Sequence, residues 1–384
     1  MLNSAAMRVL HLGRFYNERF GGLERHVDLL LRGLAPYCAV DNLVAHDHFA
    51  SATIPVEAYT VYKAPSLGTF AGTALCPTMP LLARALDRRH PYDIVHLHFP
   101  DPMAHLVAYS LPSRIRRVIT WHSDIVRQKR LLALYRPFLR DIVRRADAII
   151  TATPAHAPSS TQLRAARPER LHVVPYGMPY ARFDATAQDE EAIAALRAGL
   201  APKRHAIFAV GRHVYYKGFA YLIRAMAGIP DAVLWLGGDG PLTSALKSLT
   251  ASLQLNDRVR FLGRVADQDL PHYYHACDVF CMPSAEPAEA FGLVQLEAMA
   301  CGKPVVCCEL HNGVTYVNQD GKTGIVVAPR DVGALAGALR RLLGDKELRA
   351  RLGANGLERA HAVFSVEAMV QGTLAVYQAV LAAR

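Results

Sequence analysis

Apolar and polar positions alternate along the whole chain, with short apolar runs separated by longer amphipathic stretches. In the first half the apolar runs are typical of buried strands, at 7–13, 93–99, 117–122 and 147–151. Between these runs apolar residues recur at helical spacing, most clearly over 23–34 and 131–143. The alternation predicts an α/β architecture with parallel sheets.

The same rhythm continues in the second half, where strand-like runs occupy 205–211, 232–238, 258–263, 278–283 and 303–308. The stretch MPYARFDATAQDEE between the halves has weak periodicity and turn residues, so we place a domain boundary near residue 180. We therefore expect two Rossmann-like, doubly wound domains that face each other across a cleft. They cover 1–180 and 181–365, and a C-terminal helix, 366–384, packs back on the first. Ligands in such sheets bind beyond the carboxyl ends of the strands.

Composition fits a folded chain of two ordinary domains. Of the 384 residues 52% are hydrophobic and 20% charged, which argues against extended disorder. The chain has no uncharged apolar run of about 18 residues, and its first residues lead straight into a strand without the order of a signal peptide. We therefore expect a cytoplasmic protein. Seven cysteines without a CxxC pair favour neither a disulfide framework nor a zinc knuckle.

Positive charge is concentrated in the first half. Residues 1–178 hold 22 Lys and Arg against 13 Asp and Glu, whereas the whole chain has a net charge of +10. This excess indicates either a face that meets an anionic surface or substrate, or solvated helix faces. Nucleic acid is not expected, because no binding motif with interleaved aromatics accompanies the charge. The stretch 126–145 predicts a basic amphipathic helix, which either lies near an anionic bilayer or packs on the core.

The segment SAEPAEAFGLVQLEAMACGKPVV carries the strongest chemical signal. Glu289 and Glu297 stand eight residues apart, on either side of Phe291, Gly292 and Leu293. A helix that starts near Gly292 would leave Glu289 in the preceding loop and place Glu297 on its second turn. The free N–H groups at its start would form an anion-binding site. A nucleotide sugar needs this combination of carboxylates for hydroxyls and amides for phosphates; an acidic first helix turn is the structural alternative.

This segment resembles the donor-site motif of glycosyltransferase family 4, a large retaining family with the GT-B fold. The similarity extends over nearly the whole chain, through GRFYNERFGGLERHV, VGRHVYYKGFAYLIRA, FLGRV and DGKTGIVVAPRD. More narrowly, TWHSDIVRQKRLLALYRPF and ELHNGVTYVN look like bacterial mannosyl- or rhamnosyltransferases of O-antigen and exopolysaccharide assembly, which use GDP-sugars. The resemblance implies an acceptor-binding first domain and a donor-binding second domain.

Two cations follow the strand-like run 205–211. Arg212 and Lys217 can neutralise a departing diphosphate, which is electrostatic stabilisation of a leaving group; the alternative is a pair of surface cations. By resemblance they are the family's diphosphate ligands, and the backbone of Arg264 and Val265 contacts the base. The residues expected at the donor are Gly21, Gly22, Arg212, Lys217, Arg264, Val265, Glu289, Ala290, Phe291, Gly292, Leu293 and Glu297.

The histidines allow several interpretations. His122 ends a strand-like run, and resemblance places it beside the reacting sugar, so the expected catalytic residues are Glu289, His122, Arg212 and Lys217. His96 and His98 share one strand face like a metal pair, but no third ligand is suggested, so we favour a structural role. Asp267–Asp269 is formally a DxD motif at a predicted helix start, where Asp serves as a cap. We therefore expect neither a metal nor a cofactor.

The combined hypothesis is a retaining hexosyltransferase, with mannose from GDP-mannose as the preferred donor. A polyprenyl-diphosphate-linked saccharide is the expected acceptor, with peripheral contact to the inner face of the membrane. A UDP-sugar-dependent transferase remains an alternative, and a GT-B nucleotide-sugar epimerase is another. A nicotinamide-dependent oxidoreductase lacks its glycine fingerprint here, and a non-enzymatic membrane-associated binding protein would use the basic half alone.

Overall fold

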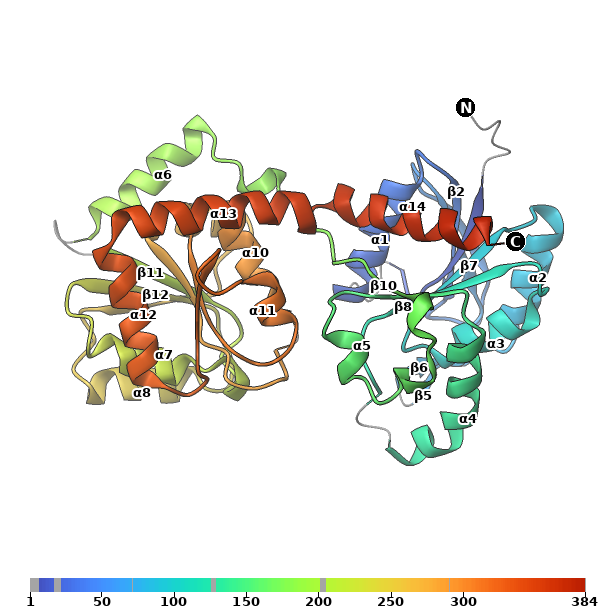
Figure 1. Cartoon of the computed structure of the whole chain (residues 1–384), viewed down its shortest axis with the longest axis horizontal. Helices are drawn as coiled ribbons and strands as arrows, with labels where there is room; N and C mark the ends of the chain where they lie inside the picture. The colour runs from blue at the N-terminus through green and yellow to red at the C-terminus, as the bar shows by residue number, and fades with distance from the viewer. Residues whose placement is uncertain are drawn as a thin grey trace. The chain divides into compact units, whose positions relative to one another are not determined.

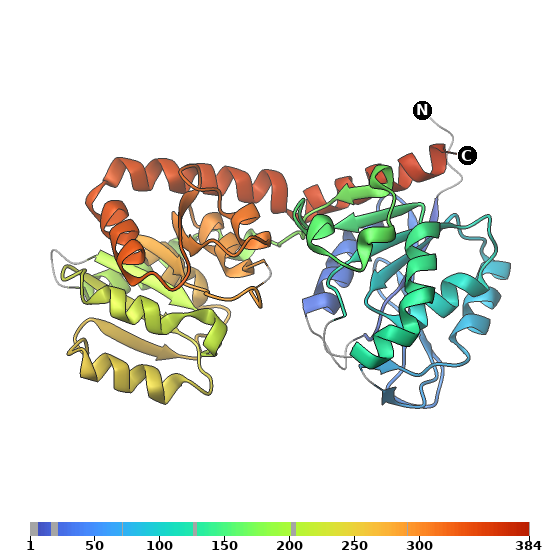
Figure 2. The ribbon, with the colours of Figure 1, turned by 60° about the horizontal axis from the view of Figure 1, so that its bottom comes forward.

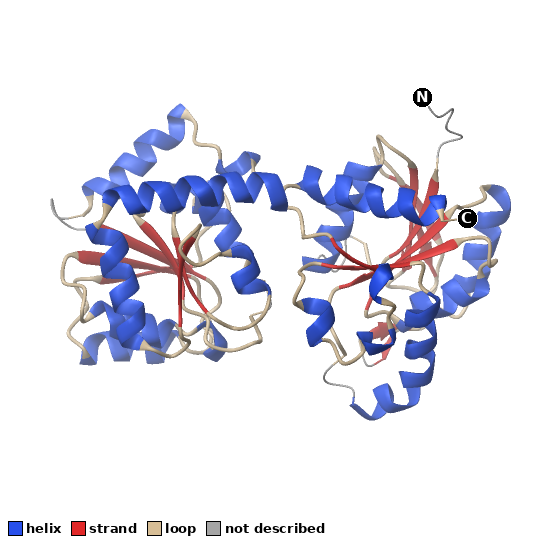
Figure 3. Ribbon diagram, in the orientation of Figure 1, coloured by secondary structure: helices blue, strands red, loops and turns tan. Residues whose placement is uncertain are grey.

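The computed structural model describes residues 7–16, 22–70, 72–125, 129–200, 205–289 and 291–383. The chain divides into two compact units, and unit 1 is discontinuous in sequence. Unit 1 comprises Met1–Gly177 and Val366–Arg384, and unit 2 comprises Met178–Ser365. In each unit the strands lie in the middle and helices surround them (Figure 3). Each unit therefore has its own sheet and its own core.

Unit 1 is built on an eight-stranded sheet of order β10-β9-β8-β7-β1-β2-β4-β3. Neighbouring strands run parallel, except that β3 is antiparallel to β4. Strand order reverses between β1 and β7, which makes this the switch point where doubly wound sheets bind ligands. The strands are β1 (Arg8–Leu12), β2 (Ala39–Ala45), β3 (Ala52–Pro55), β4 (Thr60–Ala64), β7 (Ile94–Phe99), β8 (Arg116–Trp121), β9 (Ala148–Thr151) and β10 (Leu171–Val173), beside a small separate pair, β5 (Thr69–Phe70) and β6 (Thr73–Ala74).

Helices cover both faces of this sheet (Figure 1). They are α1 (Gly22–Leu34), α2 (Met79–Arg89), α3 (Pro102–Ser110), α4 (Lys129–Arg145), α5 (His156–Ser159) and α14 (Val366–Ala382), with 3₁₀ turns η1 (Leu163–Ala165) and η2 (Pro168–Arg170). Helix α14 packs beside α1 in one core cluster. A Cβ on Gly33 would lie 2.3 Å from Cγ2 of Val370, so this close approach requires glycine. The last helix of the chain is thus part of the core of unit 1.

Unit 2 contains a six-stranded parallel sheet of order β13-β12-β11-β14-β15-β16. This is the Rossmann order, and its switch point lies between β11 and β14. Its strands are β11 (His205–Val210), β12 (Ala232–Gly237), β13 (Val259–Gly263), β14 (Val279–Met282), β15 (Val305–Cys308) and β16 (Gly324–Val327). Figure 2 shows the helices around it, which are α6 (Ala187–Ala198), α7 (Phe219–Met226), α8 (Thr243–Ser252), α9 (Leu270–Ala276), α10 (Leu293–Ala300), α11 (Gly313–Val317), α12 (Val332–Gly344) and α13 (Lys346–Phe364), with 3₁₀ turns η3 (Ala181–Phe183) and η4 (Tyr215–Lys217).

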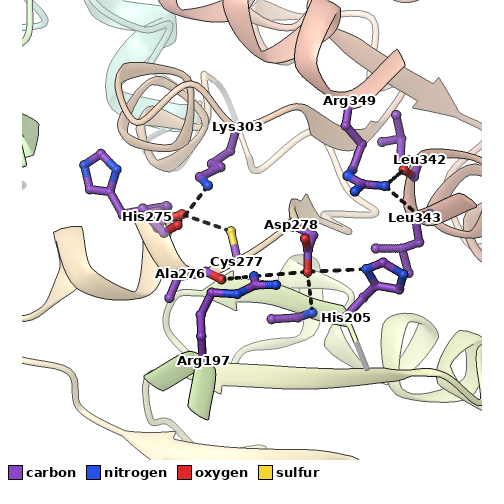
Figure 4. A network of polar contacts seen from close by, with 12 residues as sticks. Arg197, His205, His275, Ala276, Cys277, Asp278, Lys303, Leu342, Leu343 and Arg349 are labelled. Carbon is purple, nitrogen blue, oxygen red and sulfur yellow. Dashed lines mark hydrogen bonds and ion pairs between the residues drawn. The ribbon is translucent and has the colours of Figure 1, made fainter. Parts of the chain in front are cut away.

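A polar network ties the amino ends of β11 and β14 together (Figure 4). The carboxylate of Asp278 accepts a hydrogen bond from the backbone N–H of Ala206 at 2.8 Å and pairs with Arg197 at 3.4 Å. Arg197 also donates to the carbonyl of Ala276 at 2.7 Å. Because this network lies at the amino ends of the strands, away from the switch-point edge, we assign it to stability.

All nine strands predicted from the apolar runs are present, and the predicted helical stretches 23–34 and 131–143 lie within α1 and α4. The seven cysteines are buried and form no disulfide, as expected. In the described part of the chain, no helix has the length and apolar character needed to cross a bilayer. Arg127, which was expected in the basic helix, lies outside the described residues.

Candidate active site

At the switch point of unit 2, a lysine and a glutamate from two separate loops form an ion pair. Lys217, in the loop after β11, places its Nζ 2.6 Å from Oε2 of Glu289, which follows β14. The hydroxyl of Ser284 donates to the same oxygen at 3.0 Å. Both members of the pair are largely shielded, with side-chain exposures of 13% and 11%. Charge is thus concentrated where a Rossmann sheet binds its ligand.

Close backbone packing brings these two loops together. Gly218, directly after Lys217, has a φ of 67°, and a Cβ there would lie 2.0 Å from the carbonyl oxygen of Pro283. The backbone N–H of Ala285 donates to the carbonyl of Tyr216 at 2.8 Å. Only glycine permits this approach, so the local sequence fixes the distance from Lys217 to Glu289.

Helix α10 begins where the sequence predicts. Gly292 is its N-cap with a φ of 71°, Glu289 precedes it, and Glu297 lies on its second turn. The first N–H groups of a helix have no partner within the helix, and here the helix begins at Leu293, shortly after Glu289 in the chain. Asn312 donates to the carbonyl of Glu289 at 2.6 Å and holds the loop from the far side. Ala290 lies outside the described residues.

Glu297 is already bound by two neighbours. Its Oε2 accepts from the hydroxyl of Tyr274 at 2.8 Å, and its Oε1 pairs with Arg182 at 2.8 Å. Desolvation by burial raises the pKa of Glu297, while its bonds to Tyr274 and Arg182 oppose this shift. The negative charge of Asp267 raises the pKa further, so this aspartate lies near enough to share the electrostatics of Glu297.

Other residues that the sequence predicts at the nucleotide-sugar donor lie at the same edge of the sheet, and their side chains make fewer contacts. Arg212 and Arg264, in the loops after β11 and β13, are exposed and form no ion pair within the described part of the chain. The side chain of Val265 packs near Gly237, at 3.2 Å from where a Cβ would lie. Asp269 is the N-cap of α9, but its side chain makes no capping hydrogen bond, so the predicted cap is wrong in this respect.

In unit 1 the edge at the switch point carries histidines. His122 follows β8, and its Nε2 lies 3.1 Å from Nδ1 of His98 on β7. Its Nδ1 lies 2.9 Å from the hydroxyl of Tyr176. Desolvation lowers the pKa of both His98 and His122 well below the usual value, so both rings are neutral at physiological pH. Gly22 begins α1 of the same unit, and Gly21 lies outside the described residues.

The histidine contacts continue across the sheet. His98 Nε2 lies 3.1 Å from Nδ1 of His11 on β1, and His11 Nε2 lies 3.2 Å from the hydroxyl of Tyr377 on α14. The same hydroxyl lies 2.5 Å from Nδ1 of His96, whose Nε2 reaches Thr120 Oγ1 at 2.7 Å. Folding adds a third potential ligand that the sequence did not suggest, His11 from another strand, and the structural role of His96 and His98 stays a prediction.

Sequence reasoning missed several residues around these groups. His26, on α1, lies beside His122 with 5.2 Å between ring centroids, and both its ring nitrogens are buried without a hydrogen-bond partner among the described residues. Ser284, Asn312 and Arg182 were not singled out either. All three lie in segments that had drawn attention for other reasons: Ser284 opens the segment of Glu289, Arg182 lies in the boundary stretch, and Asn312 lies in ELHNGVTYVN. Polar residues directly after a strand-like run were the available signal for Ser284.

An apolar pocket of about 680 Å³ opens at the same edge of unit 1. Arg14 after β1, Pro100 after β7 and Asp124 after β8 contribute to its wall. Its apolar lining includes side chains that are exposed to solvent, namely Phe70, Leu75, Leu106, Leu131, Leu134 and Phe138. The adjoining face of α4 carries Arg136, Arg140 and Arg144. Apolar surface and positive charge therefore adjoin on this unit.

Solved structures place the fold in a known class. Sucrose-phosphate synthase from Thermosynechococcus elongatus matches with a TM-score of 0.73 and 25% identity, over 98% of this chain and all of that one. HepE from Anabaena, solved in complex with UDP, matches with a TM-score of 0.74 and 24% identity, over 97% and 100%. Two Rossmann-like units and these matches define a glycosyltransferase of the GT-B class.

Sequence relatives narrow the class to a family. The model described as Glycosyltransferase Family 4 matches residues 20–182, and that of Glycosyl transferases group 1 matches 195–359. D-rhamnosyltransferase WbpZ of Pseudomonas aeruginosa is 31% identical over 94% of this chain and 92% of its own length. O-antigen chain mannosyltransferase C of Escherichia coli is 29% identical over 98% and 99%. The chain belongs to glycosyltransferase family 4.

Proposed function

We propose that the protein transfers a hexosyl unit, with retention, from a nucleotide diphosphate sugar to a saccharide acceptor in O-antigen or exopolysaccharide assembly. The single observation that carries this proposal is the shielded Lys217–Glu289 pair at the switch point of unit 2. A lysine there supplies positive charge for a departing diphosphate, and a carboxylate supplies acceptors for sugar hydroxyls.

In this proposal Lys217 and Arg212 stabilise the leaving phosphate, while Glu289 orients the sugar. Arg212, exposed and without an ion pair to described residues, is free to turn toward the phosphates. A double displacement requires two carboxyl groups that flank the glycosidic bond. Among the described residues we assign only Glu289 to the sugar, so this mechanism has no support. The leaving phosphate instead accepts the acceptor proton on the same face. We assign Glu297 to the ribose and the backbone near Arg264 and Val265 to the base.

The preferred donor is GDP-mannose. The support comes from two relatives, one named as a mannosyltransferase and the other as a D-rhamnosyltransferase. Mannose and rhamnose belong to one hexose series. A UDP-sugar is the alternative, because the structural neighbour HepE was solved with UDP-glucose. A GT-B epimerase would convert the donor without any acceptor.

The acceptor is proposed to be a saccharide linked to polyprenyl diphosphate. The apolar pocket of unit 1 suits an isoprenoid chain, and the arginines of α4 suit the diphosphate and an anionic bilayer. His122 is assigned to the reacting sugar. We further propose peripheral attachment to the inner face of the cytoplasmic membrane, and no metal requirement.

The test is a panel of GDP- and UDP-sugars, measured for binding and for slow hydrolysis by the purified full chain in EDTA. We expect GDP-mannose to bind and to release GDP. Exclusive binding of UDP-sugars would refute the donor while leaving the enzyme class intact. Turnover only after addition of a divalent metal would refute metal independence, and conversion to another GDP-sugar without acceptor would favour the epimerase.

A further inference from the structure

Three histidine rings of unit 1 converge beyond the ends of β7 and β8. His26, His98 and His122 each offer one ring nitrogen, and these three atoms lie within 4.8 Å of one another. They come from three separate elements, since His26 is on α1, His98 on β7 and His122 after β8. Imidazole nitrogens are the common ligands of Zn²⁺, Cu²⁺ and Ni²⁺.

Two of the rings already have the spacing of a metal site. The distance from His98 Nδ1 to His122 Nε2 is 3.1 Å. Two nitrogens bound tetrahedrally to zinc, each at about 2.0–2.1 Å, are separated by about 3.3–3.4 Å. The separation of the two nitrogens need therefore change by only a few tenths of an ångström for both to bind one ion, once the rings turn so that both nitrogens face it.

The third ring is the one that can move to complete the site. No described residue makes a hydrogen bond to either nitrogen of His26, although both nitrogens are buried. An unsatisfied polar group of this kind is costly and calls for a ligand. His26 and His122 also retain some exposure, which gives an ion a route of entry.

The ring nitrogens of His98 and His122 that face away from the cluster make contacts like those of metal-bound histidines. A ligating imidazole normally donates its second N–H to a fixed acceptor. His122 has Tyr176 at 2.9 Å in that position, and His98 has His11 at 3.1 Å. Burial lowers the pKa of His26 to about 4, so its ring is neutral near pH 7, as ligation requires.

We propose that His26, His98 and His122 bind one divalent transition-metal ion, with Zn²⁺ as the best fit, and that this ion inhibits the enzyme. The inhibition rests on the proposed function, since it follows from removing His122 from the reacting sugar; binding does not. The neighbouring group His11, His96 and His98 is less suitable. Its rings are fully buried, and Tyr377 and Thr120 already hold the nitrogens of His96.

The experiment is calorimetric titration of the EDTA-stripped full chain with ZnCl₂ near pH 7.5, with MgCl₂ as the comparison ion. We expect one Zn²⁺ per chain and no heat from Mg²⁺. His26→Ala should weaken Zn²⁺ binding by more than about tenfold, and it should fold because it breaks no hydrogen bond. His46→Ala is the matched control, because His46 and His48 form a separate pair of adjacent rings.

Unchanged Zn²⁺ affinity in His26→Ala, or loss in His46→Ala, would overturn the site. If melting shows that His26→Ala is misfolded, His122→Asn replaces it with the same expected loss. Donor hydrolysis is then followed with and without Zn²⁺, where we expect inhibition of the wild type that EDTA reverses. Zn²⁺ binding without any donor turnover would remove the proposed function and leave the site; turnover without Zn²⁺ binding would do the reverse.

Discussion

Each of the two sheets has a switch point at its carboxyl edge, but one edge carries charged side chains and the other neutral rings. In unit 2 the edge holds ion pairs, Lys217 with Glu289 and Arg182 with Glu297. In unit 1 it holds imidazoles and phenols in mutual contact, with no charge on the rings because burial lowers their pKa values. One switch point thus concentrates charged side chains, and the other concentrates neutral rings that donate and accept hydrogen bonds.

The largest effect is expected from removing the carboxylate of the charged edge. Glu289→Ala should reduce transfer on the order of 10³-fold, because the donor sugar loses the carboxylate that accepts its hydrogen bonds and Lys217 loses its ion-pair partner. Steady-state kinetics with the proposed donor, GDP-mannose, measure it. Glu286→Ala is the control, since Glu286 lies in the same loop but pairs with Arg330. Near-normal turnover in a folded Glu289→Ala protein would remove Glu289 from the site.

Lowering the pH should destabilise unit 1 before it destabilises unit 2. Consider a histidine whose pKa is lower in the folded than in the unfolded protein. Its contribution to the stability of the fold is complete above pH 6.5 or so, which is about the pKa of the unfolded state. This contribution is lost as the pH falls toward and through the folded-state pKa. The pKa is lowered to about 3 at His11 and to about 4 at His26. Each such histidine should lower the free energy of unfolding of unit 1 by about 1.4 kcal/mol for each pH unit below 6.5, down to its folded-state pKa.

Hydrogen exchange of peptides from β7 and β14, followed from pH 7 to pH 4, measures this difference. We expect the β7 peptides of unit 1 to lose protection at a higher pH than the β14 peptides of unit 2. Simultaneous loss in both units would show that the histidine cluster does not control acid stability.

Removing the cation of the charged edge should have a smaller effect than removing the carboxylate. Lys217→Ala should lower kcat by about 10²-fold and weaken nucleotide diphosphate binding, because Arg212 still supplies one positive charge. Lys322→Ala, which removes an exposed lysine of the same unit, should leave both unchanged. Equal nucleotide affinity in Lys217→Ala and the wild type would contradict a phosphate contact.

The smallest effect on activity is expected at the opposite edge of the same sheet. Asp278→Ala removes the acceptor for Ala206 and the partner of Arg197, which should cost about 1–3 kcal/mol in the free energy of unfolding. Turnover per folded molecule should stay at the wild-type level. Chemical denaturation and kinetics on the same sample test both parts, and a large fall in turnover would contradict a purely structural role.

Strands built on an apolar run were predictable from the sequence, but strand β2, in which two consecutive polar residues are buried, was not. Strand β2 contains Asp41 and Asn42, which interrupt its apolar pattern although both are buried. Folding makes Asp41 acceptable because its carboxylate accepts from the hydroxyl of Tyr92 at 2.7 Å and pairs with Arg8 at 3.1 Å. These partners lie far away in the chain, so no local pattern reveals them.

The two candidate sites differ in the same way. The charged edge of unit 2 could be predicted because Lys217 and Glu289 each follow an apolar strand within a recognisable motif. The cluster in unit 1 combines His11, His26, His98 and His122 with Tyr377, from five separate segments. Only His122 was expected at a site from its own segment, and the packing of α1 and α14 on the sheet joins the others to it.

Helix α14 has a consequence for the order in which the protein is made. A ribosome completes all of unit 2 before it reaches the segment that fills the core of unit 1 and supplies Tyr377. The first unit to be translated must therefore wait, with part of one face of its core uncovered, while the second unit can finish folding. During synthesis, the nascent N-terminal half is the one that needs protection from aggregation.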